Sequence, residues 1–397
     1  MAKKDNFLDE WINPLKHSIR TRKGLTILGR EFKEIKVLGK TLHLDNEIPG
    51  IILDVFDNLG FTTKDNRKPQ IVAKSRTDYG WHLVINLPPG ISFSKCKRFQ
   101  DYFSDAVKGF VVMEWNGALH MDIQTNTLPS FIPYKWDATP YLDKLTLPVP
   151  IGYTQKGIEV FDLTDAPHMF IAGQTGMGKS NLLHIIANAL LMLPNIKLCI
   201  CDPKRLDFRY LKDRVLLARD ENEIYNLFKA LNKEHDRRVK LIEKESDEIV
   251  KIQEYEGELD YIVVMIDEWA ELDKETQPLI NRILRLSRAL GISIIGATQR
   301  PSVKVFGDSG GDSRDLFEAR VCYKVGSEIS SRMVLGEEYS MAAWLPAIKG
   351  RAIWKFGHEI KEVQTMFLSK KDRQKLAKEQ EARRWDIELS TKRLSPR

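Results

Sequence analysis

The sequence has few cysteines, and none is placed as a metal ligand would be. The 397 residues include four, at Cys96, Cys199, Cys201 and Cys322. They form no Cys-x-x-Cys pair, and no histidines lie near them at zinc-finger spacing. Two of them fall in the apolar run 196–201, where small buried side chains are expected. We therefore expect structural thiols in a reducing cytoplasm, and no metal site formed by these cysteines.

Long apolar runs are missing too. No stretch reaches the roughly 18 apolar residues that a membrane-spanning helix needs. The longest candidates are 185–193 and 262–266. The charged N-terminus, residues 1–5, is not followed by the apolar region of a secretory signal. The sequence predicts a soluble, cytoplasmic chain with no direct membrane span, which reaches a membrane only through a partner.

A charge excess of one sign occurs only at the two ends. The net charge is +6, and residues 1–40 and 370–397 each carry ten Lys/Arg against five Asp/Glu. The part between them is slightly acidic. Basic ends suit phosphate backbones or anionic lipid, although solvated tails have the same composition. Contact with a polyanion in the middle of the chain would need local basic loops.

Changes in composition along the chain predict two or three domains, as the length suggests. The predicted segments are a basic N-terminal segment (1–45, helical over 1–40), a small α/β subdomain (46–128), a proline-spaced linker (129–150), an α/β domain (151–369) and a charged C-terminal helix and tail (370–397).

The small subdomain shows both helical and strand patterns. Asn116-Gly117 lies between two β-prone runs and is the strongest short signal for a hairpin. The predicted elements are helices at 48–59 and 94–108 and strands at 79–87, 110–115 and 119–125.

The larger domain alternates apolar β-prone runs with helical patterns. This alternation favours a mostly parallel sheet covered by helices on both faces. The predicted strands are 168–172, 196–201, 261–266, 292–297, 319–325, 350–356 and 362–368, and the predicted helices are 179–193, 221–255, 275–290 and 370–389.

Residues 173–180 match the phosphate-binding pattern G-x-x-x-x-G-K-S, between a predicted strand and a predicted helix. Glycines let backbone N–H groups surround a phosphate, and the helix N-terminus adds partial positive charge. Lys179 would pair with the β- and γ-phosphates of ATP, and Ser180 would bind Mg²⁺. The predicted nucleotide contacts are Gly173, Gln174, Thr175, Gly176, Met177, Gly178, Lys179, Ser180 and Asn181.

Two adjacent carboxylates, Asp267 and Glu268, end the apolar strand 261–266. Asp267 would hold Mg²⁺ through water. Glu268 would orient and deprotonate the attacking water as general base. ATPase motors need such a second acid, whereas many P-loop kinases do not. A solvated acidic turn after a strand is the alternative reading.

A third motif, 294–301, is a buried strand that ends in polar residues. Gln299 would sense the γ-phosphate through a hydrogen bond. A simple polar strand end has the same pattern, and spacing alone does not distinguish the two.

Together these motifs resemble the FtsK/SpoIIIE family. Beyond the P-loop and the acidic pair, the resemblance rests on Asp202-Pro203-Lys204 and on the block Ala297-Thr298-Gln299-Arg300-Pro301-Ser302-Val303. Segments 168–173, 264–272, 287–292, 319–321 and 327–332 are also similar to the family's pattern.

The resemblance implies a RecA-like P-loop core preceded by a small α/β subdomain, assembled as a hexameric ring on double-stranded DNA. Each ATP site would then lie between subunits, and an arginine of the neighbour would stabilise the transition state. Arg320 is the first candidate and Arg332 the second, with surface salt bridging as the alternative for both.

A ring pore needs phosphate contacts that do not read bases. The candidate DNA contacts are Lys204, Arg205, Arg300, Lys304 and Arg314. Solvated loops are the alternative reading for each of these residues.

The sequence departs from the cell-division members of the family in three places. It shows no membrane helices before the motor and no winged-helix module after it, and the loop 307–315 is acidic where the family places DNA-facing residues. FtsK-like motors of conjugative elements, plasmids or phages fit this pattern better than chromosome segregation. Relaxase, replication or membrane-channel proteins would be partners.

The predicted function is ATP-dependent translocation of duplex DNA in conjugative transfer or in the maintenance or replication of a mobile element. Two alternatives stay open. One is a HerA-like helicase or packaging motor that acts on single strands. The other is a nucleotide-gated DNA-binding scaffold that couples a nucleoprotein complex to another machine.

Overall fold

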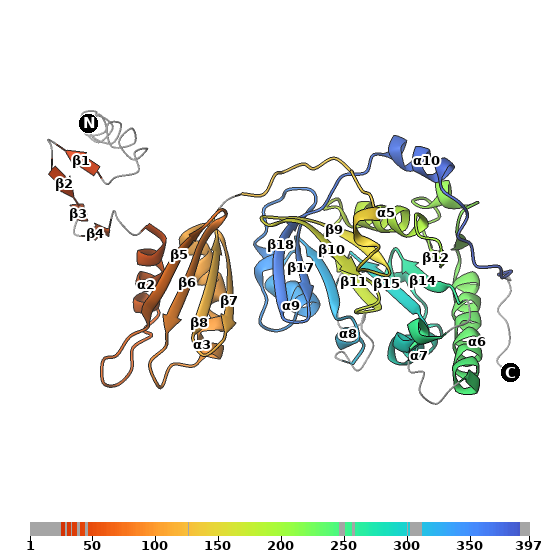
Figure 1. Ribbon diagram of the computed structural model, residues 1–397, viewed down its shortest axis with the longest axis horizontal. Coiled ribbons are helices and arrows are strands. Elements are labelled where there is room, and N and C mark those ends of the chain that lie inside the picture. The colour runs from red at the N-terminus through yellow and green to blue at the C-terminus, as the bar shows by residue number, and fades with distance from the viewer. Residues whose placement is uncertain are drawn as a thin grey trace. The chain divides into compact units, whose positions relative to one another are not determined.

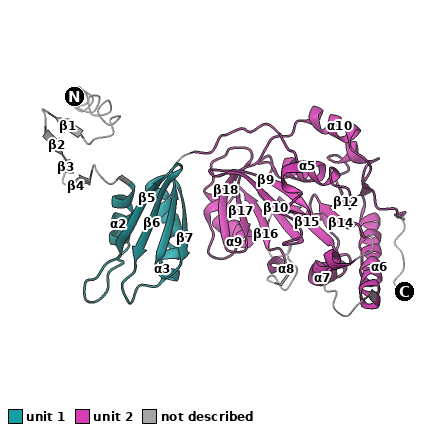
Figure 2. Cartoon of the chain, viewed as in Figure 1, with its two compact units in different colours: residues 1–126 teal, residues 127–397 magenta. Residues whose placement is uncertain are grey.

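The computed structural model consists of two compact units, Met1–Asn126 and Thr127–Arg397 (Figure 2). No helix among the described residues is long and apolar enough to cross a membrane. The structure describes residues 25–27, 30–32, 34–37, 40–43, 47–125, 127–245, 251–255, 259–299, 301 and 312–389.

Short strands occupy part of the segment for which we predicted a helix. β1 (Leu25–Ile27) pairs with β2 (Arg30–Phe32), and β3 (Glu34–Val37) pairs with β4 (Lys40–His43), both antiparallel. The helical prediction for 1–40 is therefore wrong over these strands. The sequence has Gly29 and Gly39 between β-prone runs, and such a pattern favours hairpins. Residues 1–24 lie outside the described residues.

The described part of the first unit also contains an antiparallel sheet with helices packed on it (Figure 1). The sheet has the order β5-β6-β8-β7, and its apolar core includes Phe56, Phe61 and Phe103. β5 was not predicted, because most of its side chains are exposed and it lacks an apolar alternation. The elements are α2 (Glu47–Asn58), β5 (Gln70–Thr77), β6 (Gly80–Asn86), α3 (Phe93–Arg98), α4 (Gln100–Val107), β7 (Phe110–Trp115) and β8 (Leu119–Gln124).

The second unit is built on a ten-stranded sheet of order β10-β9-β18-β17-β16-β11-β15-β14-β12-β13. The run from β16 to β13 is parallel, and the strands from β10 to β17 are antiparallel to their neighbours. The strands are β9 (Pro148–Thr154), β10 (Gly157–Asp162), β11 (His168–Ala172), β12 (Ile196–Cys201), β13 (Leu216–Ala218), β14 (Tyr261–Ile266), β15 (Ile292–Thr298), β16 (Ala319–Tyr323), β17 (Arg351–Phe356) and β18 (Glu359–Gln364).

The central strands β11 and β15 are buried along their whole length, which is typical of parallel strands covered on both faces. The fold is thus α/β with a RecA-like, largely parallel core, as the sequence predicted. The predicted helix 370–389 ends earlier, at 379. The predicted helix 221–255 is described as far as 245, and a short 3₁₀ turn, not an α-helix, occupies Ile252–Glu254. The helices of this unit are α5 (Lys179–Leu191), α6 (Glu221–Glu245), α7 (Gln277–Leu286), α8 (Asp312–Asp315), α9 (Glu328–Leu335) and α10 (Lys370–Glu379).

The proline-spaced segment 129–150 belongs to the second unit and packs on the rest of it. The backbone N–H of Phe367 donates to the Ile132 carbonyl, and that of Tyr134 donates to the Phe367 carbonyl. Arg351 is buried and donates to the carbonyls of Leu128 and Pro129. This segment therefore has a defined path along the second unit, close to the P-loop side of the sheet.

Candidate nucleotide-binding site

The phosphate-binding loop connects β11 to α5, and its glycines have backbone conformations that other residues rarely adopt. Gly173 has φ +147°, and a Cβ there would lie 2.5 Å from Cβ of Tyr323. Gly178 has φ +129° at the N-cap of α5, and a Cβ there would lie 3.0 Å from the Tyr323 ring. Both close approaches exclude a side chain, so the loop can curve around a phosphate as the motif predicted.

Lys179 is buried at the start of α5, with its ammonium folded over the loop. Its Nζ donates to the carbonyl oxygens of Gly173, at 2.5 Å, and of Gln174, at 3.1 Å. Burial lowers the pKa of Lys179 to about 8, while Glu268 and Asp267 act in the opposite direction. Phosphate oxygens at this position would favour the charged ammonium.

Asp267 and Glu268 follow β14, which lies between β12 and β15. The Asp267 backbone N–H donates to the Cys201 carbonyl, which fixes the acid beside the end of β12. Burial, together with the nearby Asp207 carboxylate, raises the pKa of Asp267 to about 6. A cation at this point would relieve the cost of the buried negative charge.

The Glu268 carboxylate is held by groups from two neighbouring strand ends. Oε1 accepts from the Thr298 hydroxyl at 2.9 Å and from the Gln299 backbone N–H at 3.2 Å. Oε2 lies 3.4 Å from Nζ of Lys204. Lys204, for which we predicted DNA contact, is thus an ion-pair partner of the predicted general base.

Gln299 links the end of β15 to the phosphate-binding loop. Its Oε1 accepts a hydrogen bond from the Thr175 hydroxyl at 2.5 Å. The three motifs meet because β11, β14 and β15 are adjacent and parallel, so their carboxyl ends share one edge of the sheet. This position suits the γ-phosphate sensor that the sequence predicted, and the role stays a prediction.

Ser180 and Asp267 are the predicted Mg²⁺ ligands. Ser180 lies in the first turn of α5, directly after Lys179. In the part of the chain that the structure describes, no cluster of three or more His, Cys, Asp or Glu side chains could hold a metal ion. A hydroxyl and one carboxylate fit Mg²⁺, which proteins commonly bind through few side chains together with the substrate's phosphates.

A cavity of about 440 Å³ adjoins the phosphate-binding loop at Gly176, Gly178 and Asn181. Its wall carries two exposed aromatic rings, Phe131 and Phe367, whose centroids are 5.7 Å apart. Sequence reasoning missed both rings, because they lie far from every motif. Backbone pairing of the proline-spaced segment with the strand end brings them together.

Asn181, predicted to contact the nucleotide, is hydrogen-bonded to the chain beyond β18, and its contact with a nucleotide stays a prediction. Its Nδ2 donates to the Met366 carbonyl at 2.6 Å, and its Oδ1 accepts from the Leu368 backbone N–H at 3.1 Å. Asn181 still lines the 440 Å³ cavity. It therefore fixes the wall of that cavity to the first turn of α5.

The two candidate arginine fingers have different surroundings. Arg320 is buried and donates to the carbonyls of Phe317, Val334 and Arg314. Arg332 on α9 is 41% exposed and pairs with Glu328 one turn earlier, at 3.0 Å. The internal acceptors of Arg320 make Arg332 the more accessible candidate, although we had ranked it second.

The structure does not gather the predicted DNA contacts around one point. Arg205 donates to the Arg219 carbonyl and lies 3.5 Å from Asp220, near the start of α6. Arg314 lies near two carboxylates, those of Asp315 at 3.2 Å and Glu337 at 3.5 Å. The other two predicted contacts, Arg300 and Lys304, fall outside the described residues.

A family model described as FtsK/SpoIIIE family matches residues 136–259, which include the phosphate-binding loop and Asp202-Pro203-Lys204. These residues are thus similar to an FtsK/SpoIIIE family domain. The second unit, which contains the predicted motor segment 151–369, has a fold shared with solved P-loop ATPases.

Two relatives described as DNA translocase FtsK illustrate the similarity. That of Treponema pallidum (strain Nichols) is 31% identical over 281 residues, which cover 63% of this chain and 34% of the relative. That of Chlorobaculum tepidum is 30% identical over 219 residues, which cover 49% of this chain and 27% of the relative. The chain thus spans about a third or less of the length of these curated relatives.

Solved structures share the fold. The pCW3 conjugation coupling protein TcpA, in its monomer form with ATPγS, has a TM-score of 0.57 at 24% identity, covering 83% of this chain and 98% of TcpA. The cytoplasmic domain of the type VII secretion ATPase EccC of Thermomonospora curvata has a TM-score of 0.51 at 21% identity, covering 68% of this chain and 34% of that one.

Proposed function

We propose that this chain hydrolyses ATP to move along double-stranded DNA. The observation that carries the proposal is the position of Glu268, next to Asp267 at the end of β14 and held by Thr298 and Gln299 across from the phosphate-binding loop. Such a fixed second acid serves hydrolysis, because it can orient and deprotonate water. The family domain and the relatives described as DNA translocases support DNA as the track.

The binding step uses the loop 173–180 and the neighbouring cavity. Backbone N–H groups of the loop and the Lys179 ammonium would hold the β- and γ-phosphates of ATP. Phe131 and Phe367 offer apolar ring faces beside Gly176 and Gly178, where a purine base could stack. The cavity of about 440 Å³ is large enough for a nucleoside.

The hydrolysis step uses Glu268 as general base. Its carboxylate accepts a proton from the attacking water, while Thr298 and the Gln299 N–H keep it oriented. Gln299 and Lys179 act on the γ-phosphate side of the site. Ser180 and Asp267 would hold Mg²⁺, which would neutralise negative charge that develops on the phosphates.

Lys204 would couple DNA binding to this site. It follows Asp202 and Pro203 in the loop after β12 and reaches the Glu268 carboxylate while remaining partly exposed. A DNA phosphate that attracted Lys204 would withdraw a cation from Glu268 and change the reactivity of the base. The motif predicted as a DNA contact would thereby transmit DNA binding to hydrolysis.

We further propose assembly as a hexameric ring, with ATP between subunits, in a system that transfers or maintains a mobile element. Exposure of Arg332 on α9 supports a finger acting on a neighbouring subunit. The fold shared with a protein described as a conjugation coupling protein supports a role of this kind. The predicted partition into 46–128 and 151–369 would correspond to the subdomain and the motor.

The test is steady-state ATP hydrolysis by the purified chain with no nucleic acid, with long duplex DNA and with single-stranded DNA. We expect strong stimulation by long duplex and its loss in Glu268→Gln. Stimulation by single strands alone would replace the translocase with a helicase. Tight binding of ATP and duplex without turnover under any condition would mean a nucleotide-gated scaffold.

A further inference from the structure

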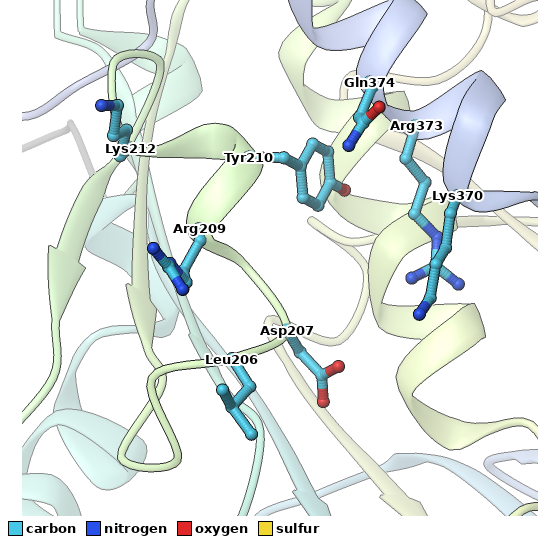
Figure 3. Close-up of a pocket in the computed structure, with 8 residues that line it drawn as sticks. All are labelled: Leu206, Asp207, Arg209, Tyr210, Lys212, Lys370, Arg373 and Gln374. Carbon is cyan, nitrogen blue, oxygen red and sulfur yellow. The ribbon is translucent and has the colours of Figure 1, made fainter.

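A second cavity, separate from the phosphate-binding loop, lies between the segment that follows Asp202-Pro203-Lys204 and helix α10. Its volume is about 680 Å³. Figure 3 shows Arg209 and Lys212 on one side and Lys370 and Arg373 on the side of α10, with Tyr210 between them. We call it the basic cleft. None of the functional motifs accounts for it.

The charges of the basic cleft are unbalanced. Four cationic side chains, Arg209, Lys212, Lys370 and Arg373, line it together with one carboxylate, Asp207. Within the described ranges, no carboxylate lies at ion-pair distance from any of the four cations. Arg373 donates instead to the Leu368 carbonyl and to Oδ1 of Asn181. Four cations beside one carboxylate leave an excess of positive charge, which attracts an anion from solution.

Both walls of the basic cleft are fixed before any ligand arrives. On one wall, Phe208 and Leu211 are fully buried, and the Phe208 N–H donates to the Asp202 carboxylate. On the other, Arg214 donates to the carbonyls of Ala377 and Lys378 at the end of α10. The cleft is therefore preformed, which lowers the cost of binding.

The floor of the basic cleft is tied to the helix that follows the phosphate-binding loop. The Tyr210 hydroxyl lies 3.1 Å from Nδ1 of His184 and accepts from Asn188 at 3.2 Å, and both partners are on α5. Arg373 reaches Asn181 in the first turn of the same helix, at 3.4 Å. Helix α5 therefore connects the residues of the cleft to the candidate ATP site.

Phosphate groups are the anions that fit this arrangement. Two arginines offer forked donors that match phosphate oxygens, and two lysines add mobile point charges. The side chains come from two separate elements and spread along an open cleft, as contacts to successive phosphates would require. Few of the lining side chains are apolar, so the cleft offers little to the side chains of a docked peptide.

We propose that the basic cleft binds the phosphodiester backbone of DNA. This inference rests on the proposed function, which supplies DNA as the ligand, and it adds a contact surface that the motifs did not predict. Contacts to phosphates alone carry no sequence information, which suits a motor that must step along any sequence. The segment that carries Arg209 and Lys212 follows Lys204, the partner of Glu268, so DNA in the cleft would contact the same loop that reaches the predicted general base.

The test measures binding of a fluorescent duplex to the full chain without nucleotide, over a series of salt concentrations. Each lost phosphate contact should reduce the slope of log K against log salt by about 0.9. We expect a reduction of roughly 1.8 for Arg209→Ala with Lys212→Ala, and of roughly 0.9 for Lys370→Ala on the opposite wall. The matched control, Lys135→Ala with Lys144→Ala, removes two exposed charges elsewhere on the same unit and should keep the slope.

The controls separate failure of this inference from failure of the proposed function. ATPγS binding should be unchanged in every variant, which verifies folding, and Lys370→Ala tests the cleft even if the double variant does not fold. Wild-type protein that bound no duplex would overturn both proposals. A different result would overturn the cleft proposal alone: the wild-type protein binds duplex and is stimulated by it, but the cleft variants have the same salt slope as the control variant. Loss of labelled polyglutamate binding with an unchanged duplex slope would make it an acidic-peptide site instead.

Discussion

Nζ of Lys204 lies 3.4 Å from Oε2 of Glu268, and this ion pair joins the loop after β12 to the acid at the end of β14. Glu268 is only 6% exposed at its side chain, whereas Lys204 is 38% exposed. The cation also lowers the pKa of the neighbouring Asp267, against the effects of burial and of Asp207. One lysine therefore acts on both acids of the candidate site.

Lys204→Ala should move the pH dependence of Mg²⁺-supported nucleotide binding. Asp267 must be ionised to hold Mg²⁺, so binding is present above its pKa of about 6 and lost as the pH falls through that value. Removing the Lys204 cation raises this pKa, and the midpoint shifts to higher pH. Binding of fluorescent ATPγS at fixed Mg²⁺, titrated over pH, measures the shift.

A variant that should shift the midpoint in the opposite direction serves as the control for this experiment. Asp207→Asn removes a carboxylate that raises the pKa of Asp267, so its midpoint should move to lower pH. Arg205→Ala changes the neighbouring cation, which faces Asp220, and should leave the midpoint in place. Identical midpoints for Lys204→Ala and Asp207→Asn would contradict the electrostatic account.

Glu268→Gln should abolish most hydrolysis without weakening ATP binding. A glutamine keeps the shape and can still accept from Thr298, but it cannot take the proton from water. The expected loss in single-turnover hydrolysis is roughly 10²–10⁴-fold. Thr298→Val, which leaves the acid but removes the 2.9 Å hydrogen bond, should lose on the order of tenfold. Equal losses in both variants would show that orientation, and not proton transfer, explains the effect.

The central strands and the meeting of the motifs could be predicted from the sequence. Apolar β-prone runs end at Ala172 and Ile266, and the motifs begin directly after these residues. Parallel strands place their carboxyl ends along one edge of the sheet, so the motifs were expected to meet there. Local signals of this kind depend on a few neighbouring residues. Gly173 and Gly178 likewise have positive φ values, which fit the glycine-dependent loop that their motif predicted.

Features that depend on distant contacts could not be predicted. Lys204 reads as a surface lysine in the sequence, and only the order of β12 beside β14 brings it to Glu268. Arg320 follows a family motif, but the carbonyls that surround it come from segments on both sides of it in the chain. The first two hairpins were missed because their short β-prone runs are embedded in a strongly basic segment.

Phe367→Ala should weaken ATP binding through the base and leave phosphate binding intact. Its ring lines the cavity beside the P-loop, and an aromatic ring that stacks on a base contributes about 1–3 kcal/mol. The dissociation constant of ATP should therefore rise by roughly 5- to 150-fold. Inhibition by inorganic tripolyphosphate should not change, because that ligand has no base.

Another exposed aromatic provides the control for this variant. Trp344 is 65% exposed and is not among the residues that line the cavity, so Trp344→Ala should bind ATP like the wild type. Phe131→Ala, on the other ring of the pair, should behave like Phe367→Ala. A parallel loss of tripolyphosphate affinity would indicate that the loop itself had moved, and would count against a base site.

Arg320→Ala and Arg332→Ala should fail in different ways. The first leaves three carbonyls without their donor inside the unit, and we expect a loss of roughly 3 kcal/mol or more in unfolding free energy. The second breaks an i,i+4 pair of about 0.3–0.5 kcal/mol, so stability should hardly change. If Arg332 acts on a neighbouring subunit, its loss should lower turnover by about 10³-fold or more.

Mixing two inactive variants tests whether Arg332 acts between subunits. Lys179→Ala protein has no working phosphate-binding loop but keeps Arg332, whereas Arg332→Ala protein has the reverse. A mixed assembly would contain sites with an intact loop from one subunit and an intact arginine from its neighbour, so DNA-stimulated hydrolysis should reappear on mixing. Both variants must bind duplex like the wild type for this comparison. Hydrolysis that stays at the level of the separate variants would assign Arg332 to its own subunit's surface and leave the trans arginine to another residue.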